Sequence, residues 1–287
     1  MLTTIFCHVD DFCNHFEKKF NKQLLCNGKK RRRKSKIKAS EVMTILFLFP
    51  YSGYKNFKEY YMRDVLKNYS NHFHNLVSYS RFIELKQQLI IPISLFTKHY
   101  CLGKCTGISI IDSCPIRTTH FKRRHSCLAM RSFVAKGKSS TGWFYGIKLH
   151  IIINDKGEII NFSITPGNVS DANKLLLKSL TKNIFGKLVC DKGYIGASKT
   201  LAGRKIKVIH KIRKNMKNVL MDYFDKLLLK KRGIIETVNG ILKECLSLEH
   251  SRHRSISGLI CHVLSTISAY HFRPKKPCVI VPNMLIS

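Results

Sequence analysis

Acidic residues are scarce in this chain. Its 287 residues include 17 Asp and Glu against 51 Lys and Arg, which gives a formal net charge of +34. Such an excess excludes an ordinary soluble enzyme, in which the two signs roughly balance, and it indicates a polyanionic partner. Nucleic acid is the first choice for that partner, and an anionic membrane surface is the second.

Long hydrophobic runs are also missing. The longest, Val42–Pro50, is interrupted by Thr44 and is far shorter than the ~18 residues that a membrane-spanning helix needs. Asp10 and Asp11 stand where a signal peptide would have its apolar region, and no basic leader precedes them. We therefore expect neither a membrane protein nor a secreted one.

Patterns typical of disulfide frameworks, zinc fingers and nucleophilic catalysis are absent. The 11 cysteines are odd in number and mostly lie in apolar runs, which favours reduced thiols in the cytoplasm. His99, Cys101 and Cys105 come nearest to a zinc motif, but no second Cys/His pair follows at finger spacing. None of the 13 histidines has a nucleophile partner at a telling spacing, so Ser/His or Cys/His catalysis is unsupported.

The first hundred residues are predicted to be mostly helical. Ile5, Val9, Phe12, Phe16 and Phe20 recur at steps of three or four, as on one face of a helix. Similar stripes predict helices at residues 40–49, with Ser40 as its cap, and at 57–65 and 80–89.

Between the first two predicted helices lies a basic run. Eight of the ten residues from Lys29 to Lys38 are Lys or Arg. A solvated loop is one interpretation. An arm that grips DNA phosphates is the favoured one, because short helices on both sides would hold the run near DNA.

After residue 105 the pattern changes to alternating strands and helices. Strands are predicted at residues 107–112, 143–153, 157–165, 187–191 and 205–212, and helices at 171–180, with Asp171 as its cap, 234–245 and 256–270. Residues 121–140 are predicted to form a long loop. The order of elements is that of a ribonuclease-H-like α/β fold. We therefore predict a basic, helical DNA-binding region at 1–105 and a ribonuclease-H-like catalytic domain at 106–287.

Three acids differ from the others, most of which fall in turns or on helix faces. Asp112, Asp191 and Glu236 each follow a run of apolar residues. A lone carboxylate in apolar surroundings is costly, whereas three that share bound cations can stay ionised. Hard cations such as Mg²⁺ prefer carboxylates, and two ions ~3.5–4 Å apart can promote attack at phosphorus. The alternative, that each acid pairs with a nearby Lys, stays open.

The predicted helix around Glu236 carries further polar residues. Arg232 and Lys243 lie four residues before and seven residues after Glu236, on one stripe of an α-helix, with Asn239 and Gly240 between. A simple salt bridge between Arg232 and Glu236 is the alternative, but it leaves Lys243 unexplained.

Short segments along nearly the whole chain form an ordered set. The segments are NLVSYSRFIEL (75–85), CLGKCTGISIIDS (101–113), KGKSSTGWFYGIKLHIIINDKGEI (136–159), TPGNVSD (165–171), VCDKGYI (189–195), KIRKNMKN (211–218), KRGIIETVN (231–239) and EHSRHRS (249–255). Through this set the chain resembles a DDE-type transposase of the insertion-sequence-982 family.

The resemblance implies a DNA transposase in which Asp112, Asp191 and Glu236 hold two Mg²⁺ ions, with Mn²⁺ as a substitute. It implies strand cleavage by water, followed by attack of the freed 3′-OH on target DNA. Arg232 and Lys243 would complete an Arg–Glu–Lys pattern, although Leu229 stands where relatives often have Tyr. The implied partners are double-stranded terminal repeats and target DNA, bound by a homodimer at the bacterial nucleoid in the cytoplasm.

Basic residues outside the triad are predicted to contact DNA. They are Lys29, Lys30, Arg31, Arg32, Arg33, Lys34, Lys192, Lys211, Arg213, Lys214 and Arg252. Tyr194 is predicted either to contact phosphate or to pack in the core, and His253 either to approach DNA or to lie in a solvated turn. Two other functions remain open: a structure-specific nuclease on the same fold, and a decayed transposase that only binds DNA. Decay would be marked by loss of an acid, and all three are present.

Overall fold

The chain forms two compact units. The computed structural model describes residues 1–24, 35–126, 128–139, 142–194, 196–211, 221–250 and 253–279. The helical unit comprises Met1–Cys101 and Glu244–Phe272, and the sheet unit comprises Leu102–Lys243 and Arg273–Ser287. The sequence-based division at residue 105 therefore differs from the structure, which groups residues 244–272 with the amino-terminal helices.

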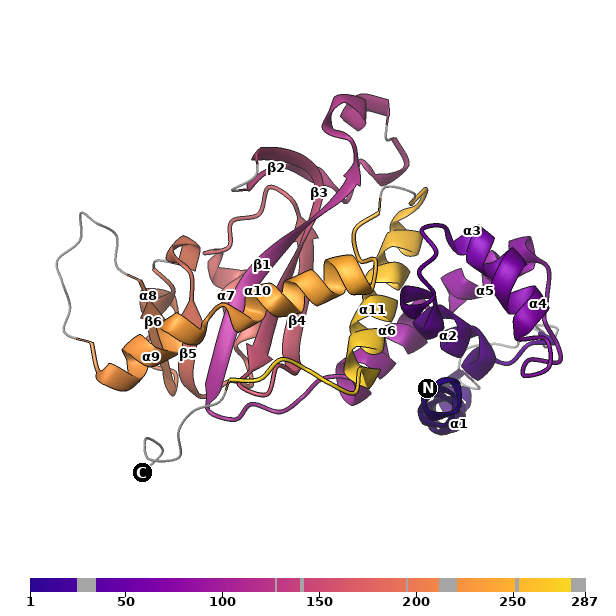
Figure 1. Cartoon of the computed structure of the whole chain (residues 1–287), viewed down its shortest axis with the longest axis horizontal. Helices are drawn as coiled ribbons and strands as arrows, with labels where there is room; N and C mark the ends of the chain where they lie inside the picture. Colours follow the sequence, from indigo (N-terminus) through magenta and orange to yellow (C-terminus); the bar gives the residue numbers. More distant parts are fainter. Residues whose placement is uncertain are drawn as a thin grey trace. The chain divides into compact units, whose positions relative to one another are not determined.

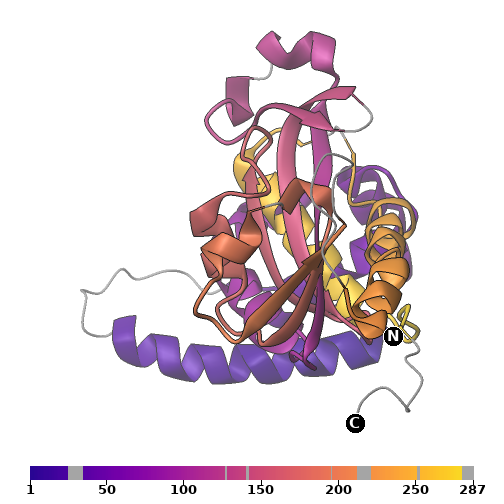
Figure 2. The same cartoon turned by 90° about the vertical axis from the view of Figure 1, so that its left-hand side faces the viewer.

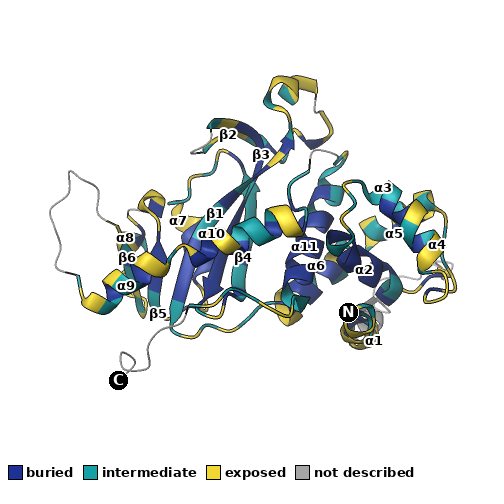
Figure 3. Ribbon diagram, in the orientation of Figure 1, coloured by how far each residue is buried: buried dark blue, intermediate teal, exposed yellow. Residues whose placement is uncertain are grey.

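The helical unit is built around its last helix. Its elements are α1 (Leu2–Leu24), α2 (Ala39–Leu48), the 3₁₀ turn η1 (Phe49–Tyr51), α3 (Phe57–Tyr60), the π-helical turn η2 (Tyr61–Val65), α4 (Leu66–Asn68), α5 (Tyr79–Gln88), α6 (Ile90–Tyr100) and α11 (Ile256–Phe272). Most of α11 is buried, as Figure 3 shows, because it packs against α2, α5 and α6. Thr97 of α6 and Ser268 of α11 are hydrogen-bonded across 2.9 Å. Residues 244–272 therefore belong to this helical core.

The predicted helices of this unit are confirmed, with shifted starts. Ser40 is buried inside α2, which begins at Ala39, and Glu41 accepts a hydrogen bond of 2.7 Å from the Lys38 amide. The cap of α5 is Ser78, whose hydroxyl accepts from the amide of Arg81. Helix α6 was not predicted. In the described ranges no helix is both long and apolar enough to cross a membrane.

A six-stranded mixed sheet forms the framework of the sheet unit (Figure 1). Its strands are β1 (Ile108–Thr119), β2 (Ala135–Ser139), β3 (Gly142–Asn154), β4 (Ile159–Pro166), β5 (Gly186–Cys190) and β6 (Ile206–His210). The order is β2-β3-β1-β5-β6, and β4 pairs with β3 beyond the end of β2. Strands β4, β3 and β1 run antiparallel, whereas β1, β5 and β6 run parallel. All five predicted strands are present, although β1 continues well beyond residue 112, where its prediction ended.

The predicted long loop at residues 121–140 is only partly correct. It contains the 3₁₀ turns η3 (Phe121–Ser126) and η4 (Leu128–Met130), and it ends in β2. Figures 1 and 2 both show η3 and η4 projecting past the end of the sheet. The sequence pattern did not predict strand β2, because Ala135–Ser139 alternates small and basic residues rather than apolar and polar ones.

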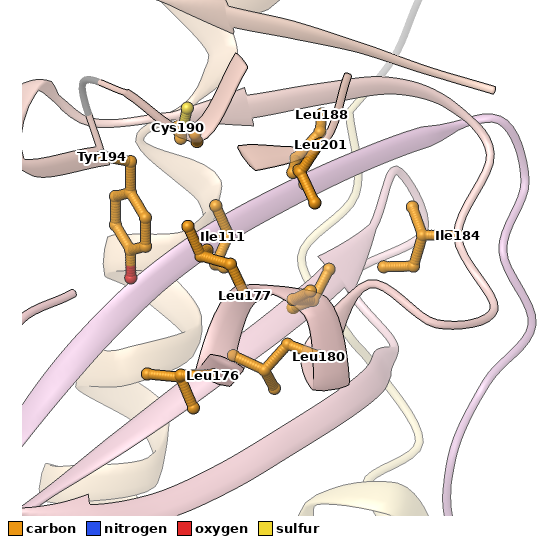
Figure 4. Close-up of a cluster of buried hydrophobic side chains, with 11 residues drawn as sticks. Ile111, Leu176, Leu177, Leu180, Ile184, Leu188, Cys190, Tyr194 and Leu201 are labelled. Atoms are coloured by element: carbon orange, nitrogen blue, oxygen red, sulfur yellow. The ribbon is translucent and has the colours of Figure 1, made fainter. Parts of the chain in front are cut away.

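Helices cover the two faces of this sheet. One face packs on α7 (Lys174–Leu180) and α8 (Ala197–Thr200), which follows the 3₁₀ turn η5 (Lys192–Tyr194). The resulting core contains Ile111, Leu177, Leu188 and Tyr194 (Figure 4). Helix α10 (Ile234–Gly240) contacts β1 on the side opposite this core. The side of β1 and β5 opposite this core also contains buried apolar residues, namely Ile110 and Val189.

A buried ion pair fixes α9 (Tyr223–Lys231), a helix that the sequence did not predict. Asp225 is 2% exposed, and its carboxylate lies 2.7 Å from Lys187 Nζ and 2.6 Å from Lys207 Nζ. Burial alone would raise the pKa of Asp225, but the hydrogen bonds from the two lysines lower it below its usual value. These contacts fasten the start of α9 to β5 and β6, and α9 leads directly into α10.

Candidate active site

Asp112 lies in the middle of β1. The strand continues to Thr119, and Asp112 pairs with Ile151 of β3. Because side chains alternate along a strand, Asp112 points away from the core that holds Ile111. The expectation that this acid closes a strand is wrong, since pairing with β3 extends β1 well beyond it.

Asp191 lies beside Asp112. It follows Cys190, the last residue of β5, and the parallel register pairs Ile110 of β1 with Val189 of β5. Two residues further along are Asp112 in β1 and Asp191 just after the end of β5, so the two acids lie at the same level, and the charge of Asp191 acts on Asp112. The surroundings differ, because Asp112 is half-buried while the Asp191 side chain is 51% exposed.

Helix α10 brings two polar residues toward these acids. Glu236 and Asn239 are three residues apart, so they share a face of the helix. Asn239 Nδ2 donates a hydrogen bond of 3.1 Å to Asp112 Oδ2. Sequence reasoning did not assign Asn239 a role, although its spacing from Glu236 was an available signal. Glu236 is 62% exposed, so its environment is not the apolar one expected from its flanking residues.

Arg232 connects the second and third acids. It joins α9 to α10, and its Nη2 lies 2.8 Å from Glu236 Oε1 and 3.9 Å from Asp191 Oδ1. The salt bridge with Glu236, which was the alternative interpretation, is present, and the arginine also reaches Asp191. Because its side chain is only 18% exposed, this charge acts with little screening by water.

Asp112 has a perturbed acidity. Burial raises its pKa from 3.8 to about 6, against the hydrogen bond from the Ser113 backbone and the charge of Arg232, which both lower it. The carboxylates of Asp191 and Asp171 raise it further. Several acids at one place would disfavour ionisation unless a cation joins them.

Asp171 is a fourth acid near the site. Its Oδ1 lies 3.1 Å from Lys148 Nζ, which also donates to the Val169 carbonyl. The prediction that Asp171 caps a helix is wrong, because Asn173 caps α7 through its side chain. Burial lowers the pKa of the neighbouring His150 to about 4, although Asp171 opposes the shift.

The donor atoms fit a hard divalent cation. A carboxylate only accepts hydrogen bonds, so Asn239 turns its amide nitrogen to Asp112. The amide oxygen, Asn239 Oδ1, is buried and has no hydrogen-bond partner among the described residues. A cation such as Mg²⁺ would satisfy this kind of oxygen and would offset the cost of ionising Asp112.

The path of the helix changes after Gly240. Ile241–Cys245 forms a π-helical turn, η6, in which more than 3.6 residues are wound into each turn. Lys243 therefore does not continue the stripe that an unbroken α-helix would form with Arg232 and Glu236. The side chain of Lys243 is half-buried within this turn.

The other predicted contacts have different outcomes. Tyr194 is 2% exposed in the core, so the packing interpretation is the correct one for it. Lys192 and Lys211 are exposed. Lys29, Lys30, Arg31, Arg32, Arg33, Lys34, Arg213, Lys214 and Arg252 lie outside the described residues.

Comparison with protein families places part of this chain in a known family. Residues 102–256, just over half of the chain, match the family model described as "Transposase DDE domain". The match includes Asp112, Asp191 and Glu236. No curated protein matches the chain. On the extent of the family match, the chain belongs to the family of transposases with a DDE domain.

Proposed function

We propose that this transposase cuts DNA at the ends of an insertion sequence and joins the freed 3′-OH to target DNA. The observation that carries the proposal is the meeting of Asp112, Asp191 and the α10 residues Glu236 and Asn239 around Arg232. They come from three segments that lie far apart in sequence, around residues 112, 191 and 232–239. A basic chain that gathers acids at one point fits an enzyme that handles phosphates through metal ions.

The finer fold and family assignments belong to the same proposal. The three antiparallel strands β4, β3 and β1, followed by parallel β5 and β6, support a ribonuclease-H-like catalytic domain. The ordered set of short segments supports membership of the insertion-sequence-982 family. The basic helical part is proposed to bind DNA through residues 1–105. The catalytic part is proposed to lie in residues 106–287, although residues 244–272 of this range pack in the helical unit.

Two Mg²⁺ ions, or Mn²⁺ in their place, are the proposed cofactors. Asp112, Asp191 and Glu236 would hold them, and the bound ions would activate the attacking oxygen and stabilise the leaving one. Arg232 lies between Asp191 and Glu236, so its guanidinium has to move aside before these carboxylates share cations. It can then remain near the DNA phosphates as a cation. Asn239 holds Asp112 in place from α10.

The proposed partners are double-stranded terminal repeats and target DNA. The charge of +34 supports binding to both. A homodimer would hold two transposon ends together for joining. The proposed location is the bacterial cytoplasm at the nucleoid, where this DNA lies.

Covalent joining is the decisive test of the function. The protein, Mg²⁺, a pre-cut end with a free 3′-OH and a target plasmid are incubated, and inserted ends are counted on the plasmid. A transposase joins the end to the plasmid. A structure-specific nuclease would only hydrolyse DNA, and a decayed transposase would bind the end without cutting or joining it.

Replacing Asn239 tests how Asp112 is held. We expect Asn239→Ala to lower the cleavage rate about tenfold, because Asp112 loses a hydrogen bond of ordinary strength. Thr237→Ala is the matched control, since Thr237 is exposed on the same helix. Equal rates for the two variants would contradict a positioning role for Asn239.

Lys243 is predicted to contact a phosphate near the cleaved bond. A cation there cannot be a metal ligand, so Lys243→Ala should lower joining of pre-cut ends about tenfold with Mg²⁺ affinity nearly unchanged. Lys243→Arg should restore part of the rate because the charge is kept. Lys230→Ala, at an exposed position of α9, serves as the control. Wild-type joining by Lys243→Ala would reject this role.

The basic run Lys29–Lys34 is predicted to grip phosphates. Its neutralisation should weaken binding to all DNA sequences equally, and the log–log salt slope should fall by ~0.9 for each phosphate that the protein no longer neutralises. The test variant replaces Arg31, Arg32 and Arg33 by Gln. The control variant makes the same change at three exposed lysines elsewhere, Lys174, Lys178 and Lys182. Equal slopes for the two triple variants would show that the run is a solvated loop.

A further inference from the structure

Three histidines lie close together inside the helical unit, and none of them takes part in the proposed cleavage and joining of DNA. They are His250 and His253, which precede α11, and His262, which lies on its buried side. One ligand nitrogen from each lies within 4.8 Å of the others. The ring centroids are 4.1 Å apart for His250 and His253, and 4.5 Å apart for His250 and His262. Within the described residues this is the one group of three metal-ligating side chains so close together.

The orientation of His262 suits a metal ligand. Its Nε2 lies 2.9 Å from the carbonyl oxygen of Ser247. A carbonyl only accepts, so Nε2 carries the proton and Nδ1 keeps its lone pair. Histidine ligands usually donate their second nitrogen to a carbonyl or carboxylate in this way. Ser247 has a left-handed backbone, with φ of 49°, which costs energy for a residue other than glycine.

His253 contributes a buried nitrogen atom, Nε2, that makes no hydrogen bond to the described residues. Such an atom is costly to bury, and a metal ion would satisfy it. Burial, with the neighbouring histidines and Lys86, lowers the pKa of His253 well below its usual value. Burial likewise lowers the pKa of His262 to about 3, so both rings are neutral, the form that binds metals.

We propose that His250, His253 and His262 form a binding site for a divalent transition-metal ion, with Zn²⁺ as the best match. Imidazole nitrogens favour Zn²⁺ and its neighbours over Mg²⁺, which prefers oxygen. Nitrogens bound to one tetrahedral zinc ion at about 2.0–2.1 Å lie about 3.4 Å apart, so modest side-chain rotation closes the site. Water would take the fourth position.

The role of this site is structural. The bound ion would tie the segment that holds Ser247, His250 and His253 to α11, the central helix of the helical unit. The positive charge of Lys86 acts against binding of a cation, because it acts on both His253 and His262 and contributes to their lowered pKa values. The Lys86 ammonium itself lies 5.1 Å from the centre of the Phe57 ring. The affinity is therefore set by a balance that the sequence can change, and Lys86→Gln should tighten binding.

Titration with Co²⁺ tests the site directly, because cobalt in a three-histidine site absorbs visible light. The full chain is used with Asp112→Asn, which weakens metal binding at the carboxylates. One equivalent of Co²⁺ should bind, Zn²⁺ should displace it, and His253→Gln should weaken binding by at least about a hundredfold, more than loss of an outer hydrogen bond costs. His74→Gln, at an exposed position of the same unit, should bind as before.

Stability provides a second measurement in case His253→Gln folds poorly. In the same full chain, Zn²⁺ at roughly a hundredfold excess over its Kd should raise Tm by about 5 °C, and Mg²⁺ should not. No visible band and no rise in Tm would overturn the proposal, as would a thiolate-to-cobalt band, which would place the ion on cysteines. Neither measurement depends on DNA cleavage, so the site can fail while the transposase function holds.

Discussion

Asp112→Asn, Asp191→Asn and Glu236→Gln should each lower DNA cleavage in Mg²⁺ by at least about a thousandfold, or about 4 kcal/mol of activation barrier. The amides keep the shape of the acids but carry no charge, so they cannot hold cations against the DNA phosphates. Binding to transposon ends should persist, because the basic surface supplies it. Removal of an acid near phosphates can even strengthen that binding.

The control for the triad is Asp222→Asn. Asp222 is exposed just before α9 and makes no side-chain cap hydrogen bond, so its loss removes a charge without changing the site. Cleavage is measured on a labelled end, and binding is measured on the same DNA without metal. Near-wild-type cleavage by any of the three variants would remove that acid from the site. Loss of binding together with cleavage would indicate misfolding instead.

The long apolar elements of this protein were predictable because burial leaves a plain pattern in them. β3 and α11 contain almost continuous apolar runs, and their predicted ranges agree closely with the structure. β2 and α9 were missed because their stability comes from partners far along the chain. β2 depends on pairing with β3, and α9 depends on the bond from Asp225 to Lys187 and Lys207.

The candidate site was predictable only in part, for a related reason. The apolar residues before Asp112 and Asp191 predicted strands, and parallel pairing of β1 and β5 then places the two acids side by side. No local pattern shows that Asn239 bonds to Asp112, because that contact depends on how α10 crosses β1. The straight α-helical stripe predicted from Arg232 to Lys243 is interrupted after Gly240, because 3.6-residue spacing cannot foresee a π-helical turn.

Ionisation of Asp112 lowers the free energy of unfolding by an amount that depends on pH. In the unfolded chain its pKa is about 3.8, and in the folded, metal-free protein it is about 6. Below about pH 3 the group is protonated in both states and costs nothing. Between about pH 4 and pH 6 the unfolded chain ionises this carboxyl while the folded protein keeps it protonated, so stability falls over this range and the full cost is reached above about pH 6. A shift of about two units corresponds to roughly 3 kcal/mol.

Asp112→Asn should therefore stabilise the metal-free protein by up to about 3 kcal/mol at pH 8 and by only about 0.5 kcal/mol at pH 4. Urea unfolding in a chelating buffer at both pH values measures the difference. Mg²⁺ should reduce the stability difference between the variant and the wild type at pH 8, because only the wild type is stabilised by cations bound at an ionised Asp112. A variant that loses cleavage would thus be more stable than the wild type without metal, since the site keeps a poorly solvated charge for its function. A difference between variant and wild type that does not change from pH 4 to pH 8 would contradict this account of Asp112.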